Sequence, residues 1–291
     1  MIYDTIVSRQ PIDKGWSGDR KYHIVTESGT SYLLRIADHQ RSDHFCRCFE
    51  HMQDAAALNI PMCRPIELGK CEEGVYAIQS WIEGQDAEEL IPTFSRQQQY
   101  TYGVDAGHIL KKLHTLSAPQ DASAWELRFN AKIDRKIAMY EKCPLKYENG
   151  DAFLNFIAQN RKLLKNRPQF YQHGDYHIGN MMVDQDGKLI IIDFDRDDYG
   201  DPWEEFNRIV WCAQASPEFA SGMVDGYFGG EVPMEFWDLL ALYIASNTLS
   251  SLPWAVAYGE REIGAMRRQA AQVLVWYDNM KNTVPTWYDK P

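Results

Sequence analysis

The hydrophobic pattern changes character part-way along the chain. Over residues 12–36, short β-rich runs alternate with small-residue turns, which predicts strand, turn, strand, turn and strand. Residues 44–59 carry an apolar stripe at helical spacing, and Ile60-Pro61 ends this helix because proline restricts the residue before it. Two further strands are predicted at 64–68 and 75–81. The first part of the chain should therefore form a sheet with one helix.

Beyond Gly84 the pattern becomes helical and the strand signals thin out. The helices that we expect there span residues 100–116, 132–142, 152–164 and most of 217–276. The last of these segments is rich in aromatic residues, which we expect mainly in a core. This change predicts two parts, residues 1–83 and residues 84–291.

One stretch in the second part, residues 173–195, reads as a loop followed by a β-hairpin. An apolar run at 181–183 and a β-branched run at 189–192 flank Asp186-Gly187, which is a strong two-residue turn signal. With Asp186-Gly187 at the two central turn positions, the ladder sets Asn180 opposite Asp193. Directly opposed residues have Cβ atoms roughly 5 Å apart.

An amide and a carboxylate at the open end of a hairpin suit a metal–nucleotide site. Mg²⁺ prefers oxygen ligands and usually rests on one or two side chains plus substrate phosphates. Asn180 and Asp193 are therefore candidate metal ligands, and Asp175 lies in the loop just before them. The alternative is a polar turn with an incidental Asp-Gly hairpin.

These residues carry a family resemblance. His173-Gly174-Asp175, Asn180 and the segment Ile192-Asp193-Phe194-Asp195 resemble the catalytic block of the aminoglycoside phosphotransferase and choline kinase-like families. The resemblance implies an α+β, protein-kinase-like two-lobed fold. It has a small antiparallel-sheet N-terminal lobe (1–83), which binds nucleotide and ends in the hinge. A larger helical C-terminal lobe (84–291) holds the catalytic loop and the acceptor site.

The same resemblance implies roles for the three polar residues. Asp175 is expected to orient, and to deprotonate, the acceptor hydroxyl, whereas Asn180 and Asp193 are expected to hold Mg²⁺. In the N-terminal lobe, the turn Gly15-Trp16-Ser17-Gly18 would cover the nucleotide phosphates, with Ser17 as a candidate contact. The alternative for that segment is a plain hairpin turn with no ligand.

The third strand departs from the family pattern, because Arg35 stands where a phosphate-binding lysine is usual. Arginine also binds phosphate, but its planar guanidinium group is larger than an ammonium and is placed differently. We therefore expect Lys21 to supply part of the phosphate binding that the usual lysine provides. By resemblance, Glu50 on the following helix is the partner of Arg35. The alternatives are a surface strand residue for Arg35 and a solvated acid for Glu50.

The segment 80–84 falls where the interlobe hinge lies in this family. By resemblance, the backbone groups of Ser80 and Ile82 bind the edge of the nucleobase. A simple strand end with a loop glycine is the alternative. Nothing in this segment separates ATP from GTP.

The composition of the chain bears on where the protein is located in the cell and on what it binds. The formal net charge of −11 argues against nucleic acid as the main partner and is compatible with a cationic small molecule. The six cysteines have irregular spacings, and no apolar run approaches the roughly 18 residues of a membrane span. The N-terminus shows no apolar signal region, so we expect a cytoplasmic protein that does not bind membranes.

The sequence thus predicts a Mg²⁺-dependent phosphotransferase that uses ATP or GTP and a hydroxyl acceptor. A cationic acceptor, with an antibiotic-inactivating aminoglycoside kinase as the leading case, follows from the acidic composition. A metabolic kinase of the choline, homoserine or sugar type is the competitor. A catalytically inactive nucleotide-binding module is the third hypothesis, and Arg35 is its only support.

Overall fold

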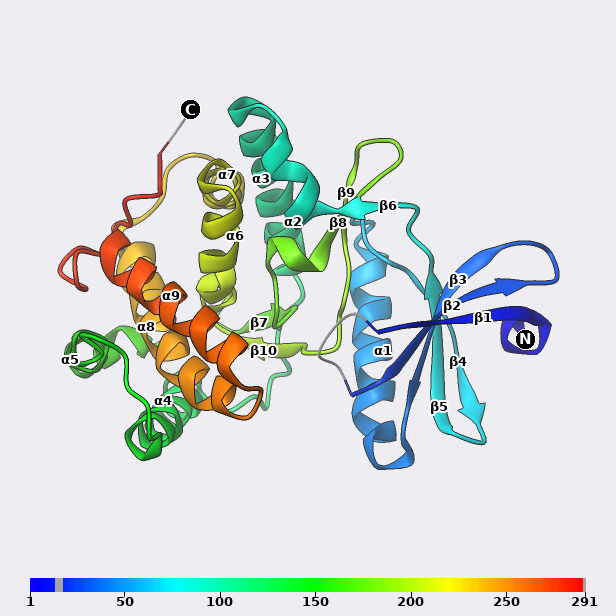
Figure 1. Ribbon diagram of the computed structural model, residues 1–291, viewed down its shortest axis with the longest axis horizontal. Coiled ribbons are helices and arrows are strands. Elements are labelled where there is room, and N and C mark those ends of the chain that lie inside the picture. Colours follow the sequence, from blue (N-terminus) through cyan, green and yellow to red (C-terminus); the bar gives the residue numbers. More distant parts are fainter. Residues whose placement is uncertain (14–17, 290–291) are drawn as a thin grey trace. The chain divides into compact units, whose positions relative to one another are not determined.

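The computed structural model describes residues 1–13 and 18–289, which form two compact units (Figure 1). The first, called the sheet unit here, comprises Met1–Leu90, His173–Asp175 and Gly179–Asp198. The second, called the helical unit, comprises Ile91–Gln172, Tyr176–Ile178 and the chain from Tyr199 onward. The α+β fold class is confirmed.

A five-stranded antiparallel sheet in the order β1-β2-β3-β5-β4 forms the body of the sheet unit. Its strands are β1 Ile6–Ile12, β2 Arg20–Thr26, β3 Ser31–Ala37, β4 Pro65–Cys71 and β5 Gly74–Ser80. The short 3-10 helices η1 (Ile2–Thr5) and η2 (His39–Arg41) accompany it. One face buries Ile24, Leu34 and Ile78, because alternate residues of a strand point to the same side.

The opposite face of the sheet carries helix α1 (Ser42–Ala57), whose Phe45 and Phe49 pack on Val75 and Ala77 (Figure 1). The sheet is thus buried on both sides at its centre. The second and third strands and the helix predicted before residue 60 are present, with ends that differ by a few residues. The first strand, β1, ends at Ile12, where the predicted pattern began, so its place was predicted wrongly.

A second, three-stranded sheet joins distant parts of the chain. It has the order β6-β8-β9, with β6 at Gly84–Asp86, β8 at Met181–Asp184 and β9 at Leu189–Ile191. Strand β6 pairs with β8, and α2 (Ala87–Leu90) follows β6. The hairpin with Asn180 and Asp193 therefore belongs to the sheet unit, whereas the sequence assigned it to the helical part. Long-range strand pairing of this kind leaves no local signal.

The register of the β8–β9 hairpin differs by one from the prediction. Met181 pairs with Ile191 and Val183 with Leu189, around a three-residue loop that ends in Gly187 at φ 78°. The carboxylate of Asp184 accepts hydrogen bonds from the N–H groups of Asp186 (3.0 Å) and Lys188 (2.8 Å). This side-chain turn favours the longer loop over the two-residue turn.

The shifted register changes what faces Asn180. Its carbonyl accepts a hydrogen bond from Ile192 N–H at 3.0 Å, so Ile192 lies opposite Asn180. The predicted direct pairing of Asn180 with Asp193 is therefore wrong, since Asp193 is one residue beyond.

The helical unit contains the long helices of the chain and one short strand pair, β7 (Phe170–Gln172) with β10 (Asp198–Gly200). Its helices are η3 Ile91–Thr93, α3 Arg96–Leu113, α4 Trp125–Lys142, α5 Asp151–Asn160, η4 Arg161–Leu164, η5 Ile178–Asn180, η6 Glu204–Arg208, α6 Ile209–Ala215, α7 Pro217–Phe228, α8 Met234–Val256 and α9 Glu260–Trp276. Of these, η5 begins in the helical unit and ends in the sheet unit. Glycines on α3 and α7 lie against each other's backbones, so a Cβ atom there would overlap the facing helix. Small residues thus set this close packing.

Helix α8 is the central helix of this unit. In the part of the chain that the structure describes, it is the one helix long and apolar enough to cross a membrane, and 67% of its apolar stretch is buried inside the protein. Phe129 of α4 packs on Tyr243 of α8, whose hydroxyl donates to the buried carboxylate of Asp201 at 2.6 Å. The apolar composition of α8 is therefore that of a core helix.

Candidate active site

His173 ties the loop before Asp175 to the strand end that leads into Asp193. Its Nε2 lies 3.0 Å from the carbonyl oxygen of Ile192, and its Nδ1 accepts a hydrogen bond from the N–H of Asp175 at 3.3 Å. One neutral tautomer, with the proton on Nε2, satisfies both contacts. Burial lowers the pKa of His173, although nearby carboxylates oppose that shift, so the ring stays neutral at pH 7.

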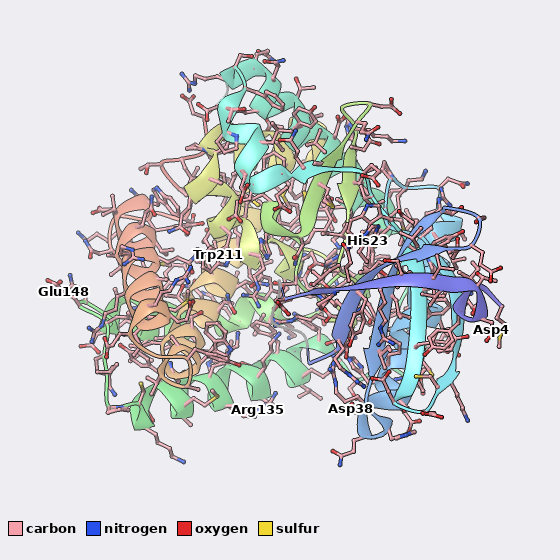
Figure 2. The ribbon with its side chains drawn as sticks, turned by 45° about the vertical axis from the view of Figure 1, so that its right-hand side comes forward. Asp4, His23, Asp38, Arg135, Glu148 and Trp211 are labelled. Carbon is pink, nitrogen blue, oxygen red and sulfur yellow. The ribbon has the colours of Figure 1, made fainter. Side chains whose placement is uncertain are left out.

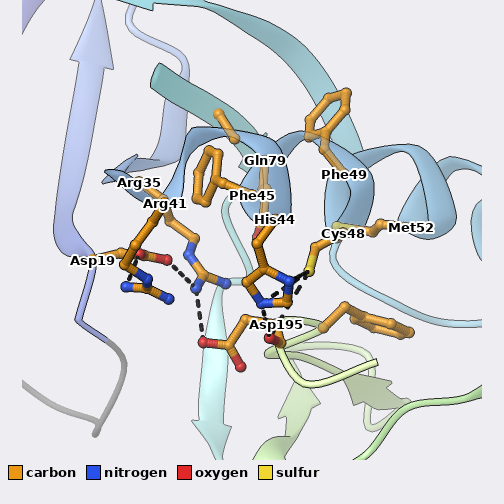
Figure 3. A pocket seen from close by; sticks show the side chains of 12 residues that line it. Asp19, Arg35, Arg41, His44, Phe45, Cys48, Phe49, Met52, Gln79 and Asp195 are labelled. Atoms are coloured by element: carbon orange, nitrogen blue, oxygen red, sulfur yellow. Dashed lines mark hydrogen bonds and ion pairs between the residues drawn. The ribbon is translucent and has the colours of Figure 1, made fainter. Parts of the chain in front are cut away.

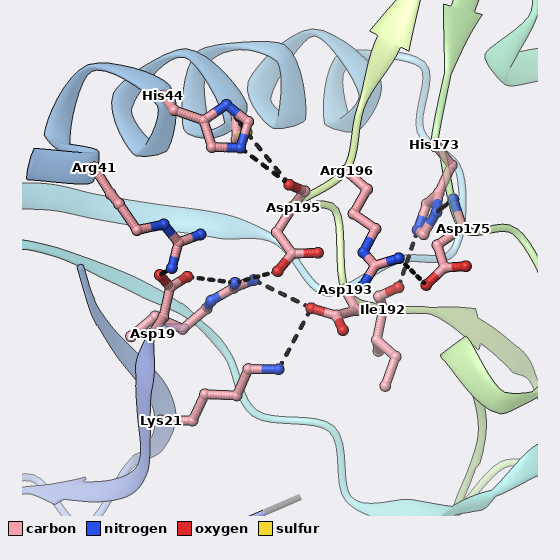
Figure 4. Close-up of polar contacts among 12 residues, drawn as sticks. Asp19, Lys21, Arg41, His44, His173, Asp175, Ile192, Asp193, Asp195 and Arg196 are labelled. Carbon is pink, nitrogen blue, oxygen red and sulfur yellow. Dashed lines mark hydrogen bonds and ion pairs between the residues drawn. The ribbon is translucent and has the colours of Figure 1, made fainter. Parts of the chain in front are cut away.

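Gly174 allows the loop to pass directly against the chain after Asp195. Its φ is 83°, and a Cβ atom at this position would overlap the carbonyl oxygen of Arg196. Only glycine satisfies both constraints without strain. The side chain of Arg196 also reaches the loop, since its Nη1 lies 3.8 Å from Asp175 Oδ2 (Figure 4).

Asn180 is oriented by the same loop. Its amide nitrogen donates to the backbone carbonyl of Asp175 at 2.9 Å, so the amide oxygen is the end that remains for a ligand. Asp193 has φ 69°, an uncommon left-handed conformation for a residue other than glycine. The structure thus brings the three residues of the predicted catalytic block together in one unit, through backbone contacts rather than the predicted pairing.

Arg35 lies at the centre of a buried ionic network. Its side chain is 4% exposed and reaches Asp19 Oδ2 at 2.7 Å, Asp195 Oδ2 at 3.0 Å and Asp193 Oδ1 at 3.3 Å (Figure 4). Burial alone would lower the pKa of Arg35, but the three carboxylates outweigh it and raise that pKa. The interpretation of Arg35 as a surface strand residue is therefore wrong.

Lys21 supplies a second cation beside Arg35. The two residues are direct partners across the antiparallel pair of β2 and β3, and Lys21 Nζ lies 3.5 Å from Asp193 Oδ1. Both cations contact the same carboxylate oxygen of Asp193. Among the described residues, no contact to the other oxygen of Asp193 is found.

The prediction that Glu50 partners Arg35 is wrong. Glu50 is exposed on α1, and the ion pairs of Arg35 within the described chain go to other acids. The buried Asp19 takes that role and also binds Arg41 Nη1 at 2.5 Å. Sequence reasoning missed Asp19, since one acid after a glycine turn resembles any loop residue. On α1, the side of the helix near Arg35 carries His44 and Cys48, which line a small cavity of about 20 Å³ (Figure 3).

A larger cavity of about 280 Å³ runs from the end of β5 to Asp193. Its lining combines apolar side chains, among them Leu33, Met182 and Ile192, with cations and oxygen ligands. The sequence-predicted residues that line it are Lys21, Arg35, Ser80, Ile82, Asn180 and Asp193. Ser17 lies outside the described residues.

At the end of β5, part of the backbone is hydrogen-bonded within the protein. The N–H of Ser80 donates to the carbonyl of Arg64 at 2.9 Å, and the hydroxyl of Ser80 accepts from Arg64 N–H at 2.8 Å. The N–H of Ser80 is therefore not available to a ligand. Trp81, the next residue, packs against His23 of β2, with ring centroids 4.2 Å apart (Figure 2 marks His23).

A model of the phosphotransferase enzyme family matches residues 8–237. The chain belongs to that family. A search of curated proteins finds no match.

Solved structures of phosphotransferases share the protein-kinase-like fold at low identity. An aminoglycoside 2'-phosphotransferase in its GDP complex superposes with a TM-score of 0.68 and 14% identity, covering 96% of this chain and 94% of that chain. An amicoumacin kinase in complex with AMP-PNP and Ca²⁺ gives a TM-score of 0.65 and 15% identity, with 95% and 90% covered. A choline/ethanolamine kinase family protein from Mesorhizobium loti gives 0.64 and 15%, with 94% and 90% covered. Identities at this level show the shared fold and leave the substrate open.

The donor set of this phosphotransferase fits the Mg²⁺ that its family implies. Asn180 can offer an amide oxygen and Asp193 a carboxylate oxygen, which are the hard ligands that Mg²⁺ prefers. No group of three or more histidine, cysteine or acidic side chains suited to a metal occurs among residues 1–13 and 18–289. A metal at this position would thus take its other ligands from substrate phosphates and water.

Proposed function

We propose that this phosphotransferase moves the γ-phosphoryl group of ATP or GTP to a hydroxyl group of a small molecule. The observation that carries the proposal is the joint placement of Asp175, Asn180 and Asp193 around His173. A neutral, buried histidine that bonds both the loop and the strand end fixes two carboxylates and an amide in one small region. Such preorganised placement is the main requirement of phosphoryl transfer, which depends on positioning and charge.

The cavity between β5 and Asp193 supports nucleotide binding. Its apolar lining suits a purine ring, and its volume of about 280 Å³ is near the lower limit of small-molecule sites. Because the N–H of Ser80 is engaged by Arg64, we propose that Ser80 contributes its carbonyl to the base and Ile82 its N–H. Backbone groups of this kind can bind either adenine or guanine, so we keep both ATP and GTP as candidate phosphoryl donors.

The part of the cavity near its cations would hold the phosphates. Lys21 and Arg35 present two cations there, and Ser17 stays a candidate contact on the turn before β2. Bound Mg²⁺ would neutralise developing charge on the phosphates, with Asn180 and Asp193 as its protein ligands. Arg35 would act as a bidentate group where a lysine is usual.

Asp175 is the group that we propose to receive the acceptor proton. Its N–H bonds to His173 and its backbone carbonyl to Asn180, which fix the main chain, while Arg196 lies 3.8 Å from its carboxylate. A carboxylate so held can orient a hydroxyl in line with the phosphoryl group and take its proton as transfer proceeds.

The catalytically inactive nucleotide-binding module remains an alternative. Its basis is Arg35, whose buried guanidinium is held by Asp19, Asp193 and Asp195. For the acceptor, the net charge of −11 favours a cationic molecule such as an aminoglycoside. A metabolic acceptor of the choline, homoserine or sugar type is the second candidate.

A coupled assay of nucleoside-diphosphate release tests the proposal. ATP and GTP would be supplied in parallel with aminoglycosides, choline, homoserine and sugars, using the wild type and Asp175→Asn. We expect release that depends on one acceptor class and falls by about a thousandfold in the variant. Acceptor-dependent release that is equal in the two proteins would refute the role of Asp175.

A further inference from the structure

One face of helix α1 contacts the segment of chain that follows Asp193. His44, Cys48 and His51 lie at intervals of four and three residues, so they share this face of the helix. His44 Nε2 lies 3.3 Å from the backbone carbonyl oxygen of Asp195, and Cys48 Sγ lies 3.9 Å from the same oxygen (Figure 3). This face therefore binds the chain beyond Asp193, while another face of α1 packs on the sheet.

The contact at the end of this face joins His51 to Asp197. His51 Nδ1 lies 2.5 Å from Asp197 Oδ2, and the side chain of Asp197 is 4% exposed. Because a carboxylate accepts hydrogen bonds, the ring donates from Nδ1 in a short, charge-assisted bond. Burial and the neighbouring Asp197 raise the pKa of the Cys48 thiol, so that thiol is neutral at pH 7. Of Cys48 and His51, the histidine is therefore the stronger donor to this carboxylate.

Alternate residues of the segment 193–197 are held by β3 and α1. Asp193 Oδ1 lies 3.3 Å and Asp195 Oδ2 lies 3.0 Å from the guanidinium of Arg35 on β3. Asp197 is bound in turn by His51 of α1. The segment is thus anchored at both of its ends, and His51 provides the anchor that lies farthest from Asp193.

The two residues between these anchors contact the catalytic loop instead. The ring of Phe194 lies 4.5 Å from that of His173, measured between centroids, and Arg196 Nη1 lies 3.8 Å from Asp175 Oδ2 (Figure 4). All these residues belong to the sheet unit. A shift of the segment would therefore disturb Asp193 and the surroundings of Asp175 together.

Helix α1 reaches this segment through His51, whereas the family pattern points to Glu50. Glu50 is exposed, and His51, the next residue, has a side chain that is 27% exposed and directed at Asp197. One step along an α-helix turns the side chain by about 100°, so these two residues cannot face the same neighbour. The link between α1 and the site thus passes through His51 and Asp197.

We propose that His51 is a positioning residue, which holds Asp197 and thereby fixes the segment that joins Asp193 to the catalytic loop. This proposal rests on the phosphotransferase function and adds to its site a residue that acts through another. Phosphoryl transfer depends on the placement of the metal ligand and of the proton acceptor. A misplacement of about 1 Å can cost about a hundredfold in rate.

Amide hydrogen exchange of the full chain tests the position of the segment without any turnover. The proteins are the wild type, His51→Leu, His51→Asn and the matched control His39→Leu, which removes an exposed histidine from η2. Leucine keeps much of the volume of histidine but has no donor, whereas the amide of asparagine places a donor near the position of Nδ1. Asp197→Asn weakens the same bond from its other side, and it carries the test if His51→Leu fails to fold.

We expect amides in 193–198 to exchange about tenfold faster in His51→Leu than in the wild type, because the segment opens more often without its anchor. Exchange there should stay near the wild-type rate in His51→Asn and His39→Leu, and exchange in β2 and β3 should not change. Equal exchange in His51→Leu and the wild type would overturn the proposal. Faster exchange throughout the sheet unit would overturn it as well, since it would indicate a general structural role.

Steady-state kinetics with the acceptor found in the release assay give a second readout. We expect kcat to fall about tenfold in His51→Leu while KM for nucleotide and acceptor stays within about twofold, and His51→Asn to recover most of the loss. Asp197→Asn should show a similar loss, and the double variant with His51→Leu should lose no more than either single one. Losses that multiply in the double variant would contradict the link between the two residues.

The two measurements separate this proposal from the proposed function. Absence of any turnover in the wild type would refute the phosphotransferase function and leave the exchange result intact. Unchanged exchange in His51→Leu, in an enzyme that transfers phosphoryl groups, would refute the positioning role alone.

Discussion

Replacement of Asp193 with asparagine should lower kcat by at least about a thousandfold, equivalent to about 4 kcal/mol of transition-state stabilisation. Asp193 is the carboxylate on which Lys21 and Arg35 converge, and it lines the cavity proposed for the nucleotide, as Asn180 does. An amide in its place offers a metal a weaker ligand and no negative charge. Nucleotide affinity, measured by calorimetry with and without Mg²⁺, should lose most of its metal dependence.

The control for this substitution is Asp186→Asn, which removes an exposed aspartate from the turn of the same hairpin. We expect that variant to keep wild-type kcat and the wild-type response to Mg²⁺. Asp193→Asn with unchanged kcat would contradict the assignment of Asp193. A loss of kcat accompanied by a collapse of thermal stability would instead indicate a structural role, so both are measured together.

Replacement of Arg35 with methionine should have the largest effect on stability. Among the described residues, the substitution leaves the buried Asp19 with Arg41 as its ionic partner, and it removes from Asp195 its ion pair with the guanidinium. Loss of one partner from a buried ionic network costs about 3–5 kcal/mol. At about 2–4 °C per kcal/mol for a unit of this size, Tm should fall by roughly 10 °C.

A double-mutant cycle separates this charge effect from the loss of packing. Asp19→Asn combined with Arg35→Met should cost less than the sum of the two single changes, because each then removes the other's unpaired charge. Arg20→Met is the matched control, since Arg20 lies on β2 of the same sheet with its side chain 42% exposed, and it should change stability by about 1 kcal/mol or less. Additive single and double changes would show that Arg35 and Asp19 do not act as a pair.

The sequence predicts much of the fold because its signals are local. Strands β2 and β3, helix α1 and helix α3 follow from periodicity, turn residues and the Ile60-Pro61 step. The family assignment came from one block of residues around Asp175, and the family model confirms it across 8–237. Local spacing sufficed for the family because the candidate catalytic residues are near neighbours in the chain.

The errors arose where distant residues decide the outcome. Nothing near Asp19 marks it as the partner of Arg35, since the pairing requires β2 and β3 to lie side by side. Glu50 fitted the family pattern by position alone, yet the helix turns it outward. The hairpin register depended on a side-chain turn at Asp184, which competes with the stronger Asp-Gly signal.

The most direct test of the central claim follows the phosphoryl group itself. The protein, with γ-labelled ATP or GTP, Mg²⁺ and the acceptor found in the release assay, is allowed a single turnover, and the label is traced to organic product or inorganic phosphate. We predict that wild-type protein places the label on an acceptor hydroxyl and that Asp175→Asn, with unchanged nucleotide binding, forms product about a thousandfold more slowly. Label that appears only as inorganic phosphate, or transfer that persists at the wild-type rate in Asp175→Asn, would contradict the account.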